Sequence, residues 1–466
     1  MENEKKGLNI GIKSFVTAIV ILFVLMIGTY ILTFVVPSGT YERVMEDGQQ
    51  VVVPGTYAET EGGVSFVKWL LSPVLVLGAE GSGTIIAIIV FLLIIGGTFS
   101  ALDHSGILKY MLEKISSRYR DKKYRLLCAV SLFFMALGSL VGSFEECVPL
   151  VPIAIALALS MGWDTMVGLG MSLLAVGCGF STGICNPFTV GVAQELAGLP
   201  MFSGLSFRIL SFVVIYIILI SFLTLYAKKV ERTNLNNVSL QEVLFCKNEN
   251  MEKGLRFFVC ILGTGIALIF ASSFIPFLQG IIMPLIALIF LLAGIFSVIS
   301  SGVEAKTYLG HFKDGMVSIL PAVLLILMAS SIKYIMTEAK IMDTMLYKAM
   351  GFVENTSPST AILWIYLIVL VLNFFIASGS AKAFLLMPLI VPLADLAGIS
   401  RQLCVLAFAY GDGFSNIFYP TNPVLLISLG LAGVNYGKWV RFSCKIQSVI
   451  LVATGVLLVI AYHAGY

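Results

Sequence analysis

The chain has 466 residues, of which 58% are hydrophobic and only 12% are charged, and its mean hydropathy is +0.98. Soluble domains carry roughly 25% charged residues, so this composition excludes an ordinary soluble protein and predicts an all-α, polytopic membrane protein. The formal net charge of +3 is small and predicts no nucleic-acid partner.

Apolar runs close to the roughly 20 residues that cross a bilayer recur about eleven times along the chain. The first, 14–36, is too long for the apolar part of a cleavable signal peptide, so we expect a retained helix. A polar loop follows at 38–64, and the short run at 65–79 suits an interfacial or re-entrant segment. The most basic loop, 109–125, predicts the cytoplasmic side, because Lys and Arg accumulate there.

The chain divides into two related halves. We expect a first repeat at 1–227 and a second at 257–466, joined by a polar linker at 228–256. The resemblance is densest between 142–191 and 378–427, which carry Gly, Ser, Asn and Pro at matching places. Apolar segments interrupted by Gly and Pro at matching places in two halves mark the binding site of secondary transporters. The sequence therefore predicts two repeats, inverted in the membrane, with the site between these two motifs.

Each motif is expected to begin with a re-entrant hairpin, at 142–162 or 378–398, and to continue as a broken helix, at 165–199 or 402–433. Glycine lets the chain leave helical geometry, and proline removes a backbone donor. The freed carbonyls and nearby hydroxyl and amide side chains suit a dehydrated cation, and half-helix N-termini suit a carboxylate. The predicted ion ligands are Ser181, Thr182, Ser415, Asn416 and Thr421.

Four charged side chains fall inside these apolar motifs, where an ionisable group costs several kcal/mol unless it is paired or hydrated. Glu145 and Glu146 lie at the first hairpin tip, and Lys382 and Asp412 lie in the second motif. They predict substrate, ion or proton handling, with an internal ion pair such as Lys382 with Asp412 as the structural alternative. Three carboxylates against one lysine favour a cationic or zwitterionic substrate, or coupling cations, over a bare dianion. The predicted substrate-binding residues are Ser143, Glu145, Glu146, Asn186, Ser378, Gly379, Ser380, Lys382, Asp412 and Asn422.

The sequence predicts no metal site and no cofactor, apart from possible coupling to Na⁺ or H⁺. The three histidines are dispersed, and none of the eight cysteines forms a CxxC pair. An intramembrane enzyme should show a histidine, a Ser/Lys dyad or a paired aspartate motif, and the segment 411–413 matches the last only partly and in the wrong order. A channel needs a continuous polar path, whereas paired broken helices favour a closed central site. Enzyme and channel therefore remain remote alternatives.

The segment 375–402 has the pattern FxxSGSxKAxxxMPxxxPLADLxGxSRQ and is followed by GDGFSN. It resembles the YfcC/C4-dicarboxylate anaerobic carrier C (DcuC-like) family of the ion transporter superfamily, close to its arginine/ornithine-type antiporter branch. The resemblance implies a homodimer in a bacterial-type inner membrane, elevator-like alternating access and often Na⁺ coupling. Superfamily members with a Ser-Asn-Thr signature at each tip bind Na⁺ and carboxylate there, whereas this chain has GSFEE at 142–146 and SGSAK at 378–382.

We therefore expect a secondary active transporter of basic amino acids, such as arginine or ornithine, that works by exchange or cation coupling. The carboxylates of Glu145, Glu146 and Asp412 would bind the substrate's ammonium or guanidinium groups. Ser143, Ser378, Ser380 and Asn422 hold its α-carboxylate. The alternative is a Na⁺-coupled C4-dicarboxylate carrier, in which Lys382 is the partner of the anion.

Overall fold

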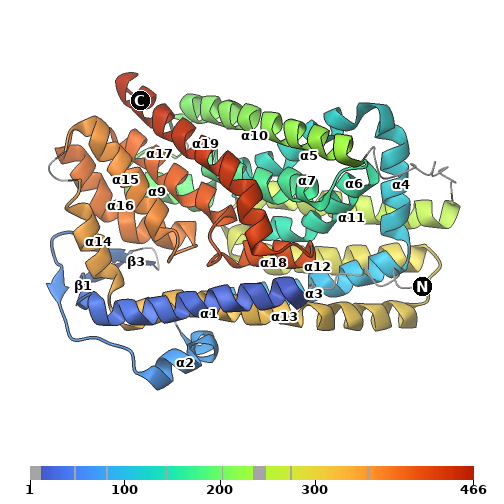
Figure 1. Ribbon diagram of the computed structural model, residues 1–466, viewed down its shortest axis with the longest axis horizontal. Coiled ribbons are helices and arrows are strands. Elements are labelled where there is room, and N and C mark those ends of the chain that lie inside the picture. The colour runs from blue at the N-terminus through green and yellow to red at the C-terminus, as the bar shows by residue number, and fades with distance from the viewer. Residues whose placement is uncertain are drawn as a thin grey trace.

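The computed structural model describes residues 12–466 except 47–48, 80–81, 143, 202, 235–247, 273–274 and 354–355. Most of its long helices lie roughly along one common axis, and they form two layers (Figure 1). Over the described residues, seven helices are long and apolar enough to cross a membrane. They are Val16–Val35, Ile85–His104, Lys123–Val141, Leu205–Thr233, Lys306–Glu338, Gly379–Leu396 and Tyr436–His463, and four shorter apolar helices accompany them. The chain is an all-α, multi-pass membrane protein, as its composition predicts.

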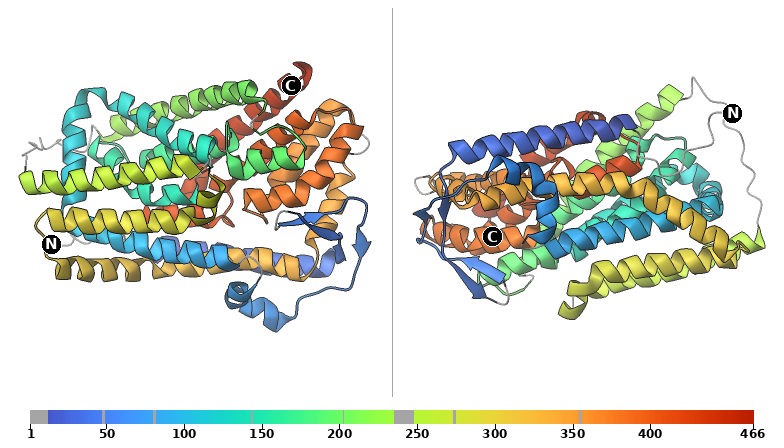
Figure 2. Two further views of the ribbon diagram at one scale, coloured as in Figure 1. Left: turned by 180° about the vertical axis from the view of Figure 1, so that it is seen from behind. Right: turned by 90° about the horizontal axis from the view of Figure 1, so that it is seen from below.

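The lower layer in Figure 1 is a bundle of long helices from both halves of the chain. Its α13 packs along α1 and α3, and α12 packs against α3 and α11. The helices α11 and α12 are seen from behind in Figure 2, left. Glycines bring α3 and α13 together, because a Cβ added at Gly315 would lie 2.3 Å from the carbonyl oxygen of Gly96. The bounds of the bundle helices are α1 (Ile12–Val35), α3 (Ser82–His104), α11 (Glu249–Ser272), α12 (Pro276–Ser300) and α13 (Ala305–Glu338). Their neighbours are α2 (Phe66–Leu75), η1 (Val76–Gly78) and α4 (Ile107–Tyr119).

Substituting Gly315 by valine is expected to separate α3 from α13 and to lower the free energy of unfolding by about 2 kcal/mol, because the added side chain overpacks a closed crossing. Gly310 is a matched control on the same helix, since a Cβ there meets no atom within 4 Å. Thermal unfolding of the purified variants measures the difference. Equal unfolding midpoints for Gly315→Val and Gly310→Val would show that the crossing is not tightly packed.

The polar loop predicted at 38–64 contains four short strands, which the sequence pattern did not indicate. β1 (Gly39–Thr40) pairs antiparallel with β4 (Ala58–Glu59), and β2 (Arg43–Glu46) pairs antiparallel with β3 (Gln49–Val52). Arg43 fixes the loop to α14 (Met342–Met350) through two hydrogen bonds of 2.7 and 2.8 Å to the carboxylate of Asp343. Because β3 also packs against α16 (Gly379–Leu396), the loop reaches over to the second motif.

The upper layer holds both motifs; α10 lies along its top edge, and α19 crosses it obliquely down to α18 (Figure 1). The largest buried apolar cluster runs through this layer. From the first half the upper layer contains η2 (Arg120–Lys122), α5 (Lys123–Ala136), η3 (Leu137–Val141), η4 (Glu145–Leu150), α6 (Val151–Ser160), α7 (Thr165–Leu169), η5 (Gly170–Leu174), α8 (Ala175–Ser181), η6 (Pro187–Gly191), α9 (Val192–Leu196) and α10 (Leu205–Asn234). From the second half the upper layer contains α15 (Pro358–Leu372), α16 (Gly379–Leu396), α17 (Arg401–Gly413), η7 (Phe414–Ile417), α18 (Pro423–Leu431) and α19 (Tyr436–His463).

The two predicted hairpin ranges need correction. Residues 378–398 contain one continuous helix, α16, and residues 142–162 contain the 3₁₀ segment η4 leading into the single helix α6. The polar tip that begins each range lies between η3 and η4 in the first half and between α15 and α16 in the second. The prolines suggested a reversal, but α16 accommodates Pro388 and Pro392 within the helix, as helices in membrane proteins can.

The two helix breaks lie where the Gly, Asn and Pro pattern predicts them. In the first half the helix ends at Ser181 and resumes at Pro187, and in the second it ends at Ile417 and resumes at Pro423. Both second halves begin with an asparagine cap: Asn186 Oδ1 accepts hydrogen bonds from two backbone N–H groups, and Asn422 Oδ1 accepts one. The paired Asn-Pro sequences therefore act as helix restarts.

The predicted linker at 228–256 is shorter in the structure. Its first residues continue α10 to Asn234, and its last residues already belong to α11 from Glu249. Residues 235–247, the middle of the predicted linker, lie outside the described part of the chain.

Candidate functional site

The two broken helices cross each other next to their breaks. A Cβ added at Gly413 would lie 2.2 Å from Ser181 Oγ, and one added at Gly177 would lie 2.4 Å from Ile417 Cγ2. Each contact joins a glycine of one half to a residue that ends the helix of the other half. Only glycine permits so close an approach, so the crossing brings the two breaks together in the upper layer.

The segment after each tip packs against the broken helix of its own half and against that of the other half. The helix α16 of the second half packs against η6 and α9 of the first, while η4 and α6 of the first half pack against α18 of the second. Gly379 lies at this contact, because a Cβ there would be 2.5 Å from Thr189 Cγ2 and 2.7 Å from Asp412 Oδ2. The second tip therefore touches both broken helices.

Lys382 and Asp412 form an ion pair whose two side chains are fully buried. The Lys382 ammonium also donates a hydrogen bond to Asn373 Oδ1. The amide nitrogen of Asn373 lies 2.6 Å from the carbonyl oxygen of Asp412, 2.6 Å from Ser415 Oγ and 2.9 Å from Asn416 Oδ1. The structure thus contains the internal ion pair that the sequence left open, and Asn373 fastens it to the second break.

Asn373 was missed by the sequence reasoning, although it is the one polar residue that ends the apolar run of α15 before the second tip. Substituting Asn373 by alanine is expected to lower the free energy of unfolding by about 2 kcal/mol, because it leaves buried polar groups without partners. Asn250 is exposed on α11 and serves as the matched control. Thermal unfolding compares the two variants, and an unfolding midpoint for Asn373→Ala equal to that of Asn250→Ala would contradict the expected role.

Ser139, in η3 just before the first tip, forms hydrogen bonds to the first break, as Asn373 does to the second. Its hydroxyl accepts from the backbone N–H of Ile184 at 3.0 Å and lies 3.3 Å from the carbonyl oxygen of Thr182. The hydroxyls of Ser181 and Thr182 donate to carbonyls of their own helix at 3.2 and 2.9 Å. These two predicted ion ligands are therefore oriented by α8.

Arg208 is a second buried cation that the sequence reasoning missed. Its side chain is 1% exposed, and Nε donates to the carbonyl oxygen of Ile184 in the first break at 3.2 Å. In sequence it reads as a flanking residue near the start of the long apolar run of α10, where arginine is common. The structure instead directs it inward, to the break.

The first tip carries the two glutamates. Glu145 is half-buried and lies within electrostatic range of Asp412, whereas Glu146 is 9% exposed. They begin η4, the segment that packs against α18. The predicted neighbour Ser143 lies outside the described residues. The structure thus brings an acidic tip from the first half towards the ion pair of the second.

Several buried polar atoms of the two motifs have no hydrogen-bond partner among the described residues. They are Glu146 Oε2, Asn186 Nδ2, Thr189 Oγ1, Asp412 Oδ2 and Thr421 Oγ1. Buried polar groups are normally hydrogen-bonded, so a concentration of unpaired ones in the motifs indicates groups available to a ligand. Thr189 was not among the predicted site residues. It lies near Asp412, because both side chains approach Gly379.

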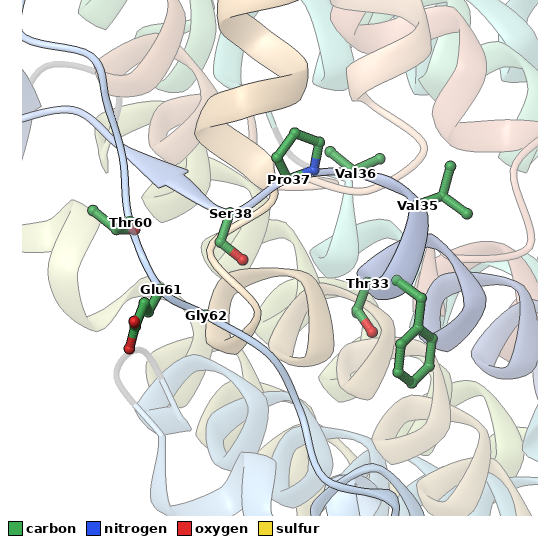
Figure 3. A pocket seen from close by; sticks show the side chains of 9 residues that line it. Thr33, Val35, Val36, Pro37, Ser38, Thr60, Glu61 and Gly62 are labelled. Carbon is green, nitrogen blue, oxygen red and sulfur yellow. The ribbon is translucent and has the colours of Figure 1, made fainter.

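The remaining predicted residues have different positions. Ser378 is exposed and caps α16 by accepting from the backbone N–H of Ala381 at 3.5 Å, and Ser380 is half-buried. The Asn422 amide donates to Asn416 Oδ1 at 3.1 Å. A hollow of about 600 Å³ lies elsewhere, between the end of α1 and residues 60–62, and none of the predicted site residues lines it (Figure 3). The motif residues therefore remain the candidate site.

Comparison with known proteins places the chain in a family. The model of the C4-dicarboxylate anaerobic carrier family, DcuC, matches residues 15–463. A protein of Escherichia coli (strain K12) named "Putative basic amino acid antiporter YfcC" is 28% identical over 96% of both chains. An uncharacterized protein of Haemophilus influenzae is 23% identical over 96% of this chain and 97% of its own.

Two solved structures are also similar, each with a TM-score of 0.44 and 18% sequence identity. One is the YdaH transporter of Alcanivorax borkumensis, aligned over 96% of this chain and 99% of that one. The other is MtrF of Neisseria gonorrhoeae, described with a class of antimetabolite efflux pumps and aligned over 96% and 95%. By the family match over nearly its whole length, the chain belongs to the C4-dicarboxylate anaerobic carrier family and is a multi-pass membrane transporter, not an enzyme.

Proposed function

We propose that the protein exchanges basic amino acids, such as arginine and ornithine, across the membrane. The observation that carries the proposal is the distribution of charge. Lys382 is committed to Asp412 in a fully buried pair, and Arg208 donates to a backbone carbonyl of the first break. Among the described residues, no basic side chain forms an ion pair with Glu145 or Glu146 at the first tip. A cationic substrate group would neutralise them, whereas a dicarboxylate would add to the negative charge.

The local geometry supports specific roles. The carboxylate of Glu146 would accept hydrogen bonds from the guanidinium or ammonium group, since its Oε2 is buried and unpaired among the described residues. Asn186 Nδ2 and Thr189 Oγ1, also buried and unpaired in the described structure, would donate to the α-carboxylate. The name of the Escherichia coli relative agrees with this substrate class.

Ser143, Ser378 and Ser380 remain proposed contacts of the α-carboxylate, as the sequence suggests. Asn422 is less suited, because its side chain caps α18 and binds Asn416. Thr421 Oγ1 is buried and unpaired among the described residues, and it stays a candidate ligand for substrate or ion.

For the transport cycle we propose alternating access of the elevator kind. The upper layer, with both tips and both broken helices, would move as the transport domain against the lower layer. The two repeats would be inverted, the tips re-entrant and the protein a homodimer in a bacterial inner membrane. The reciprocal packing of each tip segment on the other half's broken helix supports one moving unit.

Uptake into proteoliposomes tests the substrate. Vesicles loaded with ornithine are expected to accumulate labelled arginine, and unloaded vesicles are expected to accumulate little. The family description makes a Na⁺-coupled C4-dicarboxylate carrier the second candidate. Accumulation of labelled succinate in a Na⁺ gradient, without arginine exchange, would replace the proposed function by that one.

A further inference from the structure

The second helix break resembles a cation site whose oxygens already have nitrogen partners. The sequence predicts Ser415 and Asn416 as ion ligands there. Instead, the amide nitrogen of Asn373 lies 2.6 Å from Ser415 Oγ and 2.9 Å from Asn416 Oδ1. The amide nitrogen of Asn422 lies 3.1 Å from the same Asn416 oxygen. These oxygens are therefore engaged with N–H groups.

The positive charge at this break is the ammonium group of Lys382. It lies at the start of α16, is fully buried, and donates to one carboxylate oxygen of Asp412 and to Asn373 Oδ1. Carboxylate and amide oxygens are also the ligands that hard metal cations prefer. The ammonium thus lies between two oxygens of the kind that also bind alkali cations.

The first break also has a fixed cation. Arg208 is buried and donates from Nε to the carbonyl oxygen of Ile184, just beyond the C-terminal end of α8. The C-terminal end of a helix carries partial negative charge and attracts a cation. Each break therefore holds a basic side chain supplied by another element of the chain.

We propose that Lys382 is the built-in cation of the second break and takes the place of a coupled Na⁺, so that transport does not require Na⁺. Removal of the Lys382 side chain creates a Na⁺ site formed by Asp412 Oδ1, Asn373 Oδ1 and water. The independence of transport from Na⁺ rests on the proposed exchange of basic amino acids. The latent Na⁺ site is a property of the protein without substrate.

Thermal unfolding of the full-length purified protein tests the latent site without a substrate. The wild-type unfolding midpoint is expected to be the same in NaCl and in N-methyl-D-glucamine chloride of equal ionic strength. Lys382→Ala is expected to unfold at a lower temperature, and Na⁺ is expected to raise its midpoint by roughly 4 °C, because an ion that binds only the folded state stabilises it. Lys445→Ala, at an exposed position of α19, is the matched control and should show no Na⁺-specific change.

A Na⁺-specific rise in the wild-type midpoint, or none in a folded Lys382→Ala variant, would overturn the proposal. Because Lys382→Ala leaves Asp412 unpaired and can fail to fold, a second measurement uses the wild type only. Arginine–ornithine exchange in vesicles should have the same rate with Na⁺ or N-methyl-D-glucamine on both sides, and a drop of about tenfold without Na⁺ would overturn the proposal. If no buffer supports arginine uptake, the proposed function fails, and wild-type unfolding alone then decides whether Na⁺ binds.

Discussion

Replacing Lys382 by methionine is expected to lower the free energy of unfolding by about 3–5 kcal/mol, among the largest losses expected of any single substitution in the chain. The reason is that Lys382 and Asp412 are fully buried and pair with each other. Methionine has a similar length and is apolar, so the change leaves the Asp412 carboxylate charged in an apolar interior. Asp412→Asn should destabilise the protein for the converse reason, by leaving the ammonium without its counter-ion.

The double variant Lys382→Met/Asp412→Asn separates charge from packing. Because it removes both charges, its free energy of unfolding should be closer to that of the wild type than that of either single variant. Unfolding of the four purified proteins under one set of conditions completes the cycle. Single variants that each lose less than about 1 kcal/mol, or losses that simply add in the double variant, would mean that the buried pair is not formed.

Glu146→Gln is expected to reduce arginine exchange roughly 100-fold, because a hydrogen bond between charged groups contributes about 1.5–3 kcal/mol. Glu146 is buried at the first tip, its Oε2 lacks a partner among the described residues, and no described basic side chain forms an ion pair with it. Glutamine keeps the size of the side chain and removes its charge. The initial rate of labelled arginine uptake into ornithine-loaded vesicles measures the effect.

Glu195→Gln is the matched control, since Glu195 is exposed on α9 of the same motif. Its exchange rate should equal that of the wild type. Unchanged unfolding midpoints for both variants would show that the loss in Glu146→Gln is one of function. Normal exchange by Glu146→Gln would remove this glutamate from the site and leave Glu145 to balance the substrate charge.

Local chemistry explains why the breaks could be predicted from the sequence. An Asn-Pro pair after Gly and Ser specifies a helix that stops and restarts, and Asn186 and Asn422 do cap the restarted helices. The pairing of Lys382 with Asp412 was predictable only as one of two alternatives. An intramembrane lysine and an aspartate about 30 positions on can meet each other or a ligand, and in the structure Lys382 pairs directly with Asp412.

The parts that sequence reasoning missed depend on contacts between distant segments. Arg208 reads as a flanking charge of a long apolar run, and only the packing of α10 on the first break directs it inward. The hairpin predicted at 378–398 is instead one continuous helix, because α16 includes two prolines without ending. The loop at 38–64 is attached to α14 by the ion pair of Arg43 with Asp343, two residues that are far apart along the chain.

Equilibrium binding of arginine and citrulline to the purified wild-type protein tests most directly whether the acidic first tip selects a cationic substrate. The two ligands have nearly the same shape, but citrulline has a neutral ureido group where arginine has its guanidinium. Pairing with Glu145 and Glu146 should make arginine bind about 100-fold more tightly, which is the effect of a charged hydrogen bond of about 2.7 kcal/mol. Equal affinities for arginine and citrulline, or tighter binding of succinate than of either, would contradict it.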